Sequence, residues 1–406
     1  MKEVVVVGAG PAGSIAALVL ARAGVAVRVI ERARFPRDKL CGDTLNPGSL
    51  AILDRLGIAD AVRAGARPVT GMVVTGPGAS VSADYPRGLR GASMTRRELD
   101  LLLMNAALAA GARVDLGVTV REPLRDHDGN VIGVRVASDR HDTVMHAPLV
   151  IAADGRGSRL AAALRLSSFA KQPRRWAFGA YFTDVSGMTD RGEMHIRPDG
   201  YIGVAPLPGG LTNVAVVRES RRLPAPQTDQ QAFVRETLGC DRELRDRFAG
   251  ATQVSRVNVL GPLAVDGHTP GAPGLLLAGD AAGFVDPMTG DGLRFALRGG
   301  ELAAHAALEE LATGRPMYAA LGAARRREFS AKWRVNRALR SIVGSTALLQ
   351  LAATVSRHWP VPVEYLIGVA GDINLVQEGT ASTEETGSHR GIGGNERKRG
   401  ISITRG

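Results

Sequence analysis

The feature that most constrains the fold is a glycine-rich turn near the start of the chain. Residues 4–7 are four valines, which is typical of a strand buried on both faces of a parallel sheet. The sequence GAGPAG follows at residues 8–13, and residues 15–23 then form an apolar stretch that indicates a helix. A buried strand, a glycine turn and a helix in this order predict the first unit of an open α/β sheet.

Each glycine of this turn has its own physical role in binding a dinucleotide. Gly8 permits the tight turn, Gly10 lets the backbone approach a pyrophosphate at the helix N-terminus, and Gly13 lets helix and strand pack closely. A second strand, residues 25–30, ends on Glu31, whose carboxylate can accept hydrogen bonds from ribose hydroxyls. Glu rather than Arg here favours an adenosine with a free 2′-hydroxyl over NADP. The alternative is an incidental strand-turn-helix without a ligand.

Composition indicates a globular protein with room for two domains. The chain has 406 residues, of which 45% are hydrophobic and 22% charged. Its net charge is +11, but only five of the 51 basic residues are lysines and no basic run carries interleaved aromatic residues. We therefore expect no nucleic-acid partner and interpret the charge as an arginine-rich composition.

The cysteine count and the N-terminus bear on the compartment. Cys41 and Cys240 are too few for a disulfide framework or a zinc site, which favours a reducing environment. The first strand begins at once, which leaves no room for a signal peptide, and no run reaches about 18 apolar residues. We expect a cytoplasmic protein.

A polar loop follows the dinucleotide unit. Residues 35–48 include FPRDK and then Cys41, Gly42 and Asp43, before an amphipathic helix predicted at residues 49–56. With this loop the chain resembles the geranylgeranyl reductase branch of the flavoprotein superfamily that also contains p-hydroxybenzoate hydroxylase. The resemblance implies bound FAD, with Cys41 and Gly42 on its flavin side. A small buried hydrophobe is the alternative interpretation of Cys41.

Two further motifs resemble the same superfamily. Thr95 can cap a helix that runs to residue 110, and the resemblance places Arg96 near the FAD. The alternative is an exposed, charged first turn. Residues 114–151 predict a hairpin with its turn at 128–130, and its second strand leads to Asp154 and Gly155. The resemblance implies that the backbone of this Asp-Gly turn approaches the cofactor.

The strongest later signal lies at residues 274–302. A buried strand ends at Gly279 and Asp280, which resemble the second FAD motif of the superfamily, in which the Asp binds the ribityl chain. The loop 287–292 then opens a helix predicted at residues 293–307. Its backbone N-H groups and the helix N-terminus can face the flavin ring and stabilise the anionic reduced form. The motifs together place these residues at the cofactor: Gly8, Gly10, Ala12, Gly13, Glu31, Arg32, Cys41, Gly42, Arg96, Asp154, Gly155, Gly279, Asp280, Pro287, Gly290, Asp291, Gly292 and Leu293.

Residues 178–217 are strand-rich and predict an antiparallel sheet. The run around Tyr201 resembles the substrate-domain strands of the reductases, but Gly203 and Ala205 stand where that family usually has Trp and Phe. Both replacements remove large rings, so we expect a wider or differently shaped pocket. Tyr201 is a candidate hydrogen-bond donor in this pocket, and a structural tyrosine is the alternative.

The predicted fold class is α/β with two domains, a Rossmann-like FAD-binding domain and an inserted antiparallel-sheet substrate domain, followed by C-terminal helices. Residues 321–340 predict a basic helix and 341–355 an apolar stretch. This region could cap the substrate cavity, pack on the protein's own core, or rest on a membrane surface with the arginines at positions 325–327, 334, 337 and 340 facing lipid phosphates. The predicted ranges are 1–72, 92–165 and 265–320 for the FAD-binding domain, 73–91 and 166–264 for the substrate domain, 321–376 for the C-terminal helices and 377–406 for a disordered tail.

Three functions are consistent with these motifs. In the first, reduced FAD delivers hydride to an isolated C=C of an isoprenoid or quinone side chain, with Cys41 and Tyr201 as catalytic residues. In the second, reduced FAD reacts with oxygen and hydroxylates an aromatic or polyketide substrate. The third is a flavin-binding partner protein without turnover. No second nucleotide-binding unit or metal motif is seen, so electrons come from transient NAD(P)H or a protein donor, and the partner is a hydrophobic molecule or lipid.

Overall fold

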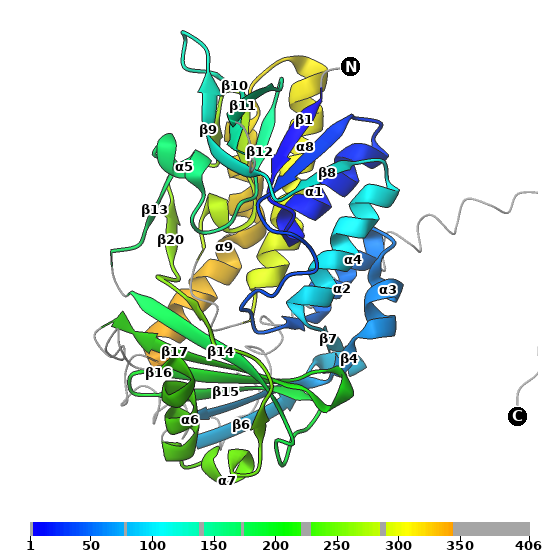
Figure 1. Ribbon diagram of the computed structural model, residues 1–406. Helices are drawn as coiled ribbons and strands as arrows, with labels where there is room; N and C mark the ends of the chain where they lie inside the picture. The colour runs from blue at the N-terminus through cyan, green and yellow to red at the C-terminus, as the bar shows by residue number, and fades with distance from the viewer. Residues whose placement is uncertain are drawn as a thin grey trace, which may run out of the picture.

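The computed structural model describes residues 3–76, 79–137, 142–171, 174–220, 229–284 and 290–343. These residues form two halves, one around a mostly parallel six-stranded sheet and one around a larger, mostly antiparallel sheet (Figure 1). The predicted α/β fold class with an added antiparallel sheet is therefore confirmed.

Strands from all three predicted cofactor motifs lie side by side in the six-stranded sheet. β1 pairs in parallel with β2 and with β12, and β12 pairs in parallel with β22. Because carboxyl ends of parallel strands share one edge, the turns after β1, β12 and β22 converge there. In spatial order the strands are β21 (Gly271–Ala272), β22 (Leu275–Leu277), β12 (Val150–Ala152), β1 (Val4–Val7), β2 (Val27–Glu31) and β8 (Arg113–Leu116).

Helices cover one face of this sheet. The helix after the glycine turn, α1 (Pro11–Arg22), packs against α4 (Arg96–Ala109) and α8 (Gly292–Thr313). Pro11 stands in its first turn, where a missing N-H costs nothing. The helix therefore begins earlier than the apolar stretch indicates. α8 likewise extends to Thr313, beyond the predicted end at residue 307, and stops where Gly314 adopts a left-handed φ of 69°.

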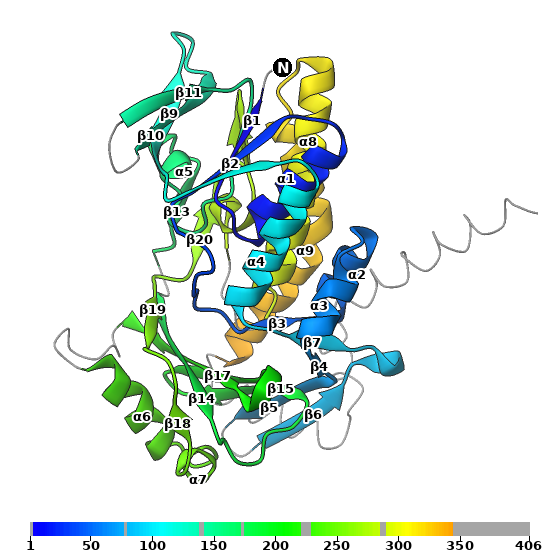
Figure 2. The same cartoon turned by 45° about the vertical axis from the view of Figure 1, so that its right-hand side comes forward.

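The opposite face carries a small antiparallel sheet (Figure 2). The sequence predicts one hairpin over residues 114–151, but the structure has more strands there, because both flanking segments join the six-stranded sheet. The turn predicted at residues 128–130 is correct, since it connects β9 to β10. The small sheet consists of β9 (Thr119–Arg125), β10 (Val131–Ala137) and β11 (Asp142–His146), and α5 (Arg159–Ala163) packs on β9.

The second half is an eight-stranded sheet with two helices on its outer face (Figure 2). Aromatic and β-branched side chains of alternate positions, such as Phe178, Phe182 and Val216, pack under these helices. The helices are α6 (Gln230–Cys240) and α7 (Arg245–Phe248). The strands are β5 (Gly71–Gly76), β6 (Ala79–Asp84), β14 (Arg175–Thr183), β15 (Arg191–Arg197), β16 (Gly200–Pro206), β17 (Thr212–Glu219), β18 (Thr252–Gln253) and β19 (Asn258–Leu260).

Apart from the last described helix, the remaining elements are short. Asn46 caps α2 by accepting a hydrogen bond from the Ser49 N-H at 2.9 Å, so this helix starts two residues before the predicted one. The helical elements are α2 (Pro47–Arg55), α3 (Ala59–Gly65) and the 3-10 turns η1 (Pro86–Gly88), η2 (Pro208–Gly210) and η4 (Gly279–Ala282). The strands are β3 (Thr44–Leu45), β4 (Arg67–Val69), β7 (Gly91–Ser93), β13 (Ser167–Phe169) and β20 (Val265–Gly267).

The last described helix, α9 (Tyr318–Val343), packs along α8 and against β21 and β22. Arg325 is buried on it, with its guanidinium 5.4 Å from the Phe329 ring centroid. The predicted basic helix is therefore present, and the alternative in which Arg325 faces lipid phosphates is wrong because this residue packs on the core. Among the described helices, none is both long and apolar enough to cross a membrane. The predicted apolar stretch from residue 344 onward and the predicted tail lie outside the described residues.

Candidate active site

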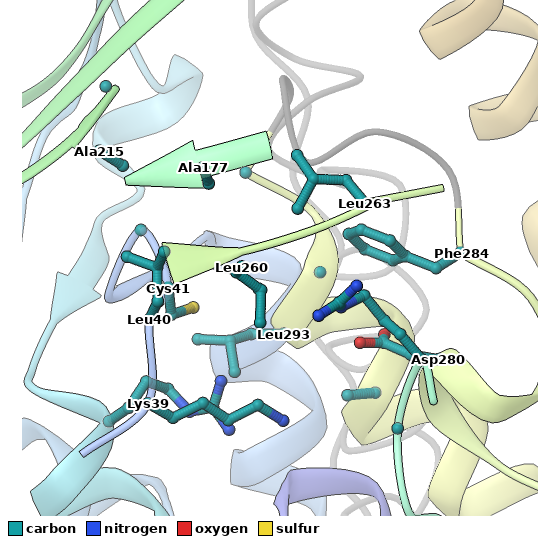
Figure 3. Close-up of a pocket in the computed structure, with 18 of the residues that line it drawn as sticks. Lys39, Leu40, Cys41, Ala177, Ala215, Leu260, Leu263, Asp280, Phe284 and Leu293 are labelled. Carbon is teal, nitrogen blue, oxygen red and sulfur yellow. The ribbon is translucent and has the colours of Figure 1, made fainter. Parts of the chain in front are cut away.

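A cavity of about 380 Å³ lies between the two halves. Backbone turns of the α/β half border one part, and side chains of the large sheet border the other. Figure 3 shows Ala177 and Ala215 across the cavity from Lys39 and Asp280. Fourteen predicted site residues line it: Gly10, Ala12, Arg32, Cys41, Gly42, Arg96, Asp154, Gly155, Tyr201, Gly279, Asp280, Gly290, Gly292 and Leu293.

The first glycine turn has the geometry that a bound pyrophosphate requires. Gly8 adopts a φ of +100°, which favours glycine. A Cβ on Gly13 would lie 1.8 Å from the Gly8 carbonyl oxygen, so only glycine fits at this crossing of strand and helix. Gly10 is open toward the cavity, because the nearest atom to a Cβ there would be the Arg37 side chain at 3.8 Å. The turn therefore leaves its backbone accessible at the N-terminus of α1.

Glu31 lies behind this turn rather than on the cavity wall. Its carboxylate is buried and accepts hydrogen bonds from the backbone N-H of Ala9 at 2.8 Å and of Ala33 at 2.9 Å. A carboxylate has about four acceptor positions, so these bonds leave capacity for ribose hydroxyls. In the structure its visible role is to hold the glycine turn. Its contact with an adenosine ribose stays a prediction.

The Asp-Gly turn lies next to the first glycine turn. A Cβ on Gly8 would lie 2.5 Å from the Ala153 carbonyl oxygen, so the backbones of the two turns are in contact. Asp154 Oδ2 accepts a hydrogen bond from the Arg159 N-H at 3.1 Å. Its Oδ1 is buried and has no hydrogen-bond partner within the described ranges, and burial raises the pKa of this carboxyl. This oxygen atom at the cavity wall can still accept a hydrogen bond, which fits a ligand with hydroxyl or amide donors.

The second glycine motif completes this part of the wall. A Cβ on Gly279 would lie 2.8 Å from the Ala12 Cβ, so the turn after β22 touches the start of α1. Gly290, Gly292 and Leu293 line the cavity where α8 begins. Pro287, also predicted at the cofactor, lies outside the described residues.

Asp291 is not brought to the cavity wall. Its buried carboxylate forms an ion pair with Lys332 Nζ at 2.6 Å and accepts a hydrogen bond from Asn46 Nδ2 at 3.2 Å. This side chain therefore ties the start of α8 to α9 and to the N-cap of α2. The sequence offers no spacing that indicates these partners, because they are far away along the chain.

The loop that carries Cys41 also borders the cavity. Cys41 is half-buried, and in Figure 3 its sulfur points into the space bordered by Leu260 and Leu293. Burial raises the pKa of the Cys41 thiol, although the charge of Arg96 opposes this rise. The thiol is therefore protonated at neutral pH and has a cation beside it.

Arg96 is fixed under this loop by a carboxylate on its own helix. Its Nε and Nη2 donate to the two oxygens of Asp100 at 2.7 and 2.8 Å, and Arg37 lies 3.0 Å from the same carboxylate. Arg96 is 5% exposed, so the alternative of an exposed charged turn is wrong. Burial would lower the pKa of Arg96, but Asp100 and Cys41 outweigh it and raise that pKa further. Arg96 is therefore always a cation.

The large sheet supplies an apolar wall with few side-chain atoms. Gly203 and Ala205 lie on β16, and a Cβ added to Gly203 would meet only the Ala215 carbonyl oxygen, at 4.0 Å. Tyr201 is 3% exposed and borders the same space. The other apolar cavity residues on this sheet are Met72, Ala177, Met194, Ala215, Val217 and Leu260, and Leu40, Leu263 and Phe284 border the same cavity from outside the sheet. The open position at Gly203 agrees with the wider pocket expected from the sequence.

Sequence reasoning missed several polar groups near the cavity. Lys39 lines it, and burial together with Arg96 lowers the pKa of its ammonium. Asn213 lines it from β17 and donates a hydrogen bond to the Cys41 carbonyl at 2.8 Å. Lys39 could have been predicted as a cavity residue, because it is two residues before Cys41. Asn213 could not, because it is far from this loop in the sequence and only the folded structure brings the two together.

Comparison with known proteins decides the family. The model of a family described as FAD binding domain matches residues 1–315 of this chain. The chain belongs to this FAD-binding family. The predicted FAD cofactor is confirmed at this level, and the glycine turns and the unpartnered Asp154 oxygen fit it.

Relatives of this FAD-binding protein include named reductases. A menaquinone reductase of Mycolicibacterium smegmatis is 33% identical over 315 residues, covering 74% of this chain and 75% of the relative. Digeranylgeranylglycerophospholipid reductase 2 of Methanopyrus kandleri is 31% identical over 318 residues, covering 76% and 77%. These matches confirm the predicted resemblance, and the protein is an FAD-dependent oxidoreductase.

A solved structure supports the same fold. The geranylgeranyl bacteriochlorophyll reductase-like protein of Thermoplasma acidophilum has a TM-score of 0.75 with 22% identity, covering 91% of this chain and 99% of that one. At this identity the likeness concerns the fold alone. It shows that the FAD-binding protein described here has the two-part architecture of such flavoproteins.

Proposed function

We propose that this FAD-dependent oxidoreductase saturates a C=C bond in the isoprenoid chain of a quinone or lipid. One observation carries the proposal: a single cavity joins the turns of the FAD motifs to an apolar wall of small side chains on β14, β16 and β17. An extended hydrocarbon chain has no polar groups to satisfy and suits such a wall. The named relatives act on molecules of this class.

In this reaction two atoms of hydrogen are added across the double bond. Reduced FAD would supply a hydride to one carbon. The other carbon needs a proton, and the Cys41 thiol lines the same cavity in its protonated form. After the S-H bond breaks, the thiolate is beside the Arg96 cation, which stabilises it until a solvent proton restores the thiol.

Other residues of the cavity would hold the FAD and orient the substrate. Gly10, Ala12, Asp154, Gly279 and Asp280 would hold the FAD by backbone and carboxylate contacts. The predicted residues that also line the cavity are proposed to contact the FAD on the same basis: Arg32, Gly42, Gly155, Gly290, Gly292 and Leu293. Tyr201 would contact the isoprenoid chain, because it is buried and lines the same cavity from β16.

The proposed reaction also needs an electron donor and a cellular compartment. We infer that NAD(P)H visits the flavin transiently or that a protein donor replaces it, and that the enzyme works in the cytoplasm. A lipid-soluble substrate suggests contact with the inner membrane surface during turnover.

A second function is flavin-dependent oxygenation of an aromatic or polyketide substrate. The Asp154-Gly155 turn and the missing rings at Gly203 and Ala205 favour it, because they resemble hydroxylase features and leave room for a broad substrate. The two functions differ in whether oxygen is needed.

The deciding experiment reduces the FAD-loaded protein with dithionite or NADPH under nitrogen. Menaquinone and geranylgeranyl lipids are then added, and the products are analysed by mass spectrometry. After the ring has been reoxidised to the quinone, a product whose isoprenoid chain is heavier by two hydrogen atoms, formed without oxygen, supports the reductase. A product that forms only after oxygen is admitted, and carries one oxygen atom, contradicts it and supports the oxygenase.

Cys41→Ser provides a sharper test of the proton donor. A serine hydroxyl is a far weaker acid than a thiol, so the rate of saturation should fall by roughly 10²-fold or more. Flavin absorbance per protein should stay within error of wild type. Cys240→Ser, at the exposed end of α6, is the matched control and should leave both quantities unchanged. Full activity of Cys41→Ser would return Cys41 to a packing role.

A further inference from the structure

A buried carboxyl group stands directly after the Cys41-Gly42 pair. Asp43 is 1% exposed and has a φ of +55°, an unusual conformation for a residue with a side chain. Its carbonyl accepts a hydrogen bond from the Met94 N-H at 3.0 Å, which ties the loop to the start of α4. The Asp43 side chain does not line the cavity, so the proposed chemistry has no direct use for it.

Two side chains of the large sheet bind this carboxyl. Asp43 Oδ2 accepts a hydrogen bond from the Tyr181 hydroxyl at 2.8 Å and another from Asn213 Nδ2. Tyr181 and Asn213 are directly opposite each other on the paired strands β14 and β17. A carboxyl group of the α/β half is thus held by one cross-strand pair of the other half.

The same cluster fixes Cys41. Asn213 Nδ2 also donates to the Cys41 carbonyl at 2.8 Å, so one amide group contacts both the Asp43 carboxyl and the Cys41 backbone. Arg96, in the first turn of α4, lowers the pKa of the Cys41 thiol, whereas a charged Asp43 carboxyl raises it. Arg96 and Asp43 therefore have opposite effects on the charge of Cys41.

We propose that Asp43 is a positioning residue whose protonation state sets the acidity of the Cys41 thiol. Asp43 Oδ1 is buried and lacks a hydrogen-bond partner within the described ranges, so it is the oxygen that can carry a proton. A charged Asp43 opposes formation of a thiolate at Cys41, and a neutral Asp43 leaves Arg96 to favour it. The proton lost by Cys41 during turnover is then easier to release when Asp43 is neutral.

The groups that face Asp43 determine when it changes charge. Burial raises the pKa of Asp43 to about 7, against the smaller opposing effects of Tyr181, Asn213 and Arg96. Arg96, in the first turn of α4, acts on Asp43 mainly through the charge of its guanidinium. Cys41 is the other titratable neighbour on the same loop. Asp43 is therefore neutral in part of the molecules at neutral pH.

The test measures the Cys41 thiol itself, because this inference rests on the proposed role of Cys41 in turnover. In the FAD-loaded protein with Cys240→Ser, Cys41 is the one thiol in the sequence. Its alkylation rate with iodoacetamide is measured from pH 6 to 10. Asp43→Asn keeps the shape but removes the charge, so the midpoint should move down by about one pH unit and the rate at pH 7.5 should rise about tenfold.

Two further variants complete the design. Tyr181→Phe removes a donor that favours the charged carboxyl, so more molecules hold a neutral Asp43 at pH 7.5 and the alkylation rate at this pH rises by a smaller factor. Tyr181→Phe also tests the link between Asp43 and Cys41 if Asp43→Asn fails to fold. Asp142→Asn, a matched change at an exposed position on β11, should leave the profile unchanged.

The outcomes separate the two proposals. Profiles of Asp43→Asn and Tyr181→Phe that coincide with that of Asp142→Asn would overturn the inference. Alkylation needs no substrate, so shifted profiles support the link between Asp43 and Cys41 even in a protein that saturates no double bond. Absence of saturation would overturn the proposed function alone.

Discussion

At the scale of single residues, the cavity combines a group whose charge is fixed by a neighbouring carboxylate with a group that can accept a further hydrogen bond. Arg96 is locked by Asp100, and Asp154 keeps one acceptor free at the wall. The sequence predicted most of these residues, because glycine turns and the acids beside them have recognisable spacing. Asn213 and Tyr181 could not be predicted, since their function depends on sheet register rather than on any local pattern.

Asp280 offers the clearest residue-scale prediction for the cofactor. Asp280→Ala removes a carboxylate at the turn after β22, where we propose that it binds the ribityl chain. Loss of a charge-assisted hydrogen bond of about 2 kcal/mol should weaken FAD binding roughly 30-fold. The measurement is FAD affinity by fluorescence titration of the apoprotein. A variant that retains the wild-type affinity would show that Asp280 does not contact the cofactor.

Asp43 makes a separate prediction for stability. Its pKa is raised from 3.8 to about 7 on folding, so the folded state holds this proton more tightly than the unfolded state. Its contribution to the free energy of unfolding is therefore complete below about pH 4, falls as the pH rises toward 7, and is constant above that.

The matching measurement is urea unfolding of wild type and Asp43→Asn at pH 5 and pH 7.5. Because asparagine does not ionise, the difference in unfolding free energy between the two proteins should shift by about 2 kcal/mol between these conditions, with wild type relatively weaker at pH 7.5. A difference that is the same at both pH values would mean that Asp43 ionises at its ordinary pKa.

At the scale of elements, the crossing of α1 and α8 depends on residues without side chains. A Cβ on Gly300 would lie 2.2 Å from the Ala12 carbonyl oxygen, which cannot move without moving the glycine turn. The sequence predicted both helices because they are apolar and regular. It did not predict their closeness, since a glycine inside a helix has several interpretations.

Gly300→Ala should therefore destabilise the protein by about 2 kcal/mol through overpacking at this crossing. Gly239→Ala is the matched control, because Gly239 lies in α6 and a Cβ there meets no atom within 4 Å. The control should be neutral or slightly stabilising, since alanine favours helix. Thermal unfolding of both variants measures this, and equal transition temperatures would contradict the packing argument.

At the scale of the whole molecule, segments far apart in sequence meet at one edge of the parallel sheet. β1, β12 and β22 are adjacent, so the order of motifs along the chain is converted into a continuous wall. This convergence was predictable, because parallel strands place their following turns together. The three-stranded sheet on the other face was not, since one hairpin and three strands give similar alternating patterns.

The ion pair between α8 and α9 leads to a prediction for the stability of the whole molecule. Lys332→Met removes the cation of the buried ion pair with Asp291 and should cost about 3 kcal/mol of unfolding free energy. Asp291→Asn in the same protein should recover much of this loss, because the charge that Lys332 balances is gone. Urea unfolding of the single and double variants measures the coupling, and strictly additive effects would show that the two residues do not interact.

This ion pair also has a consequence for how the enzyme is made. A ribosome releases the first glycine turn early, but Lys332 emerges only after most of the polypeptide has been synthesised. The start of α8, which borders the cavity, lacks its buried counter-ion until then. Binding of FAD should therefore occur late, largely after translation. Nascent chains arrested on the ribosome before α9 is synthesised should carry no bound FAD.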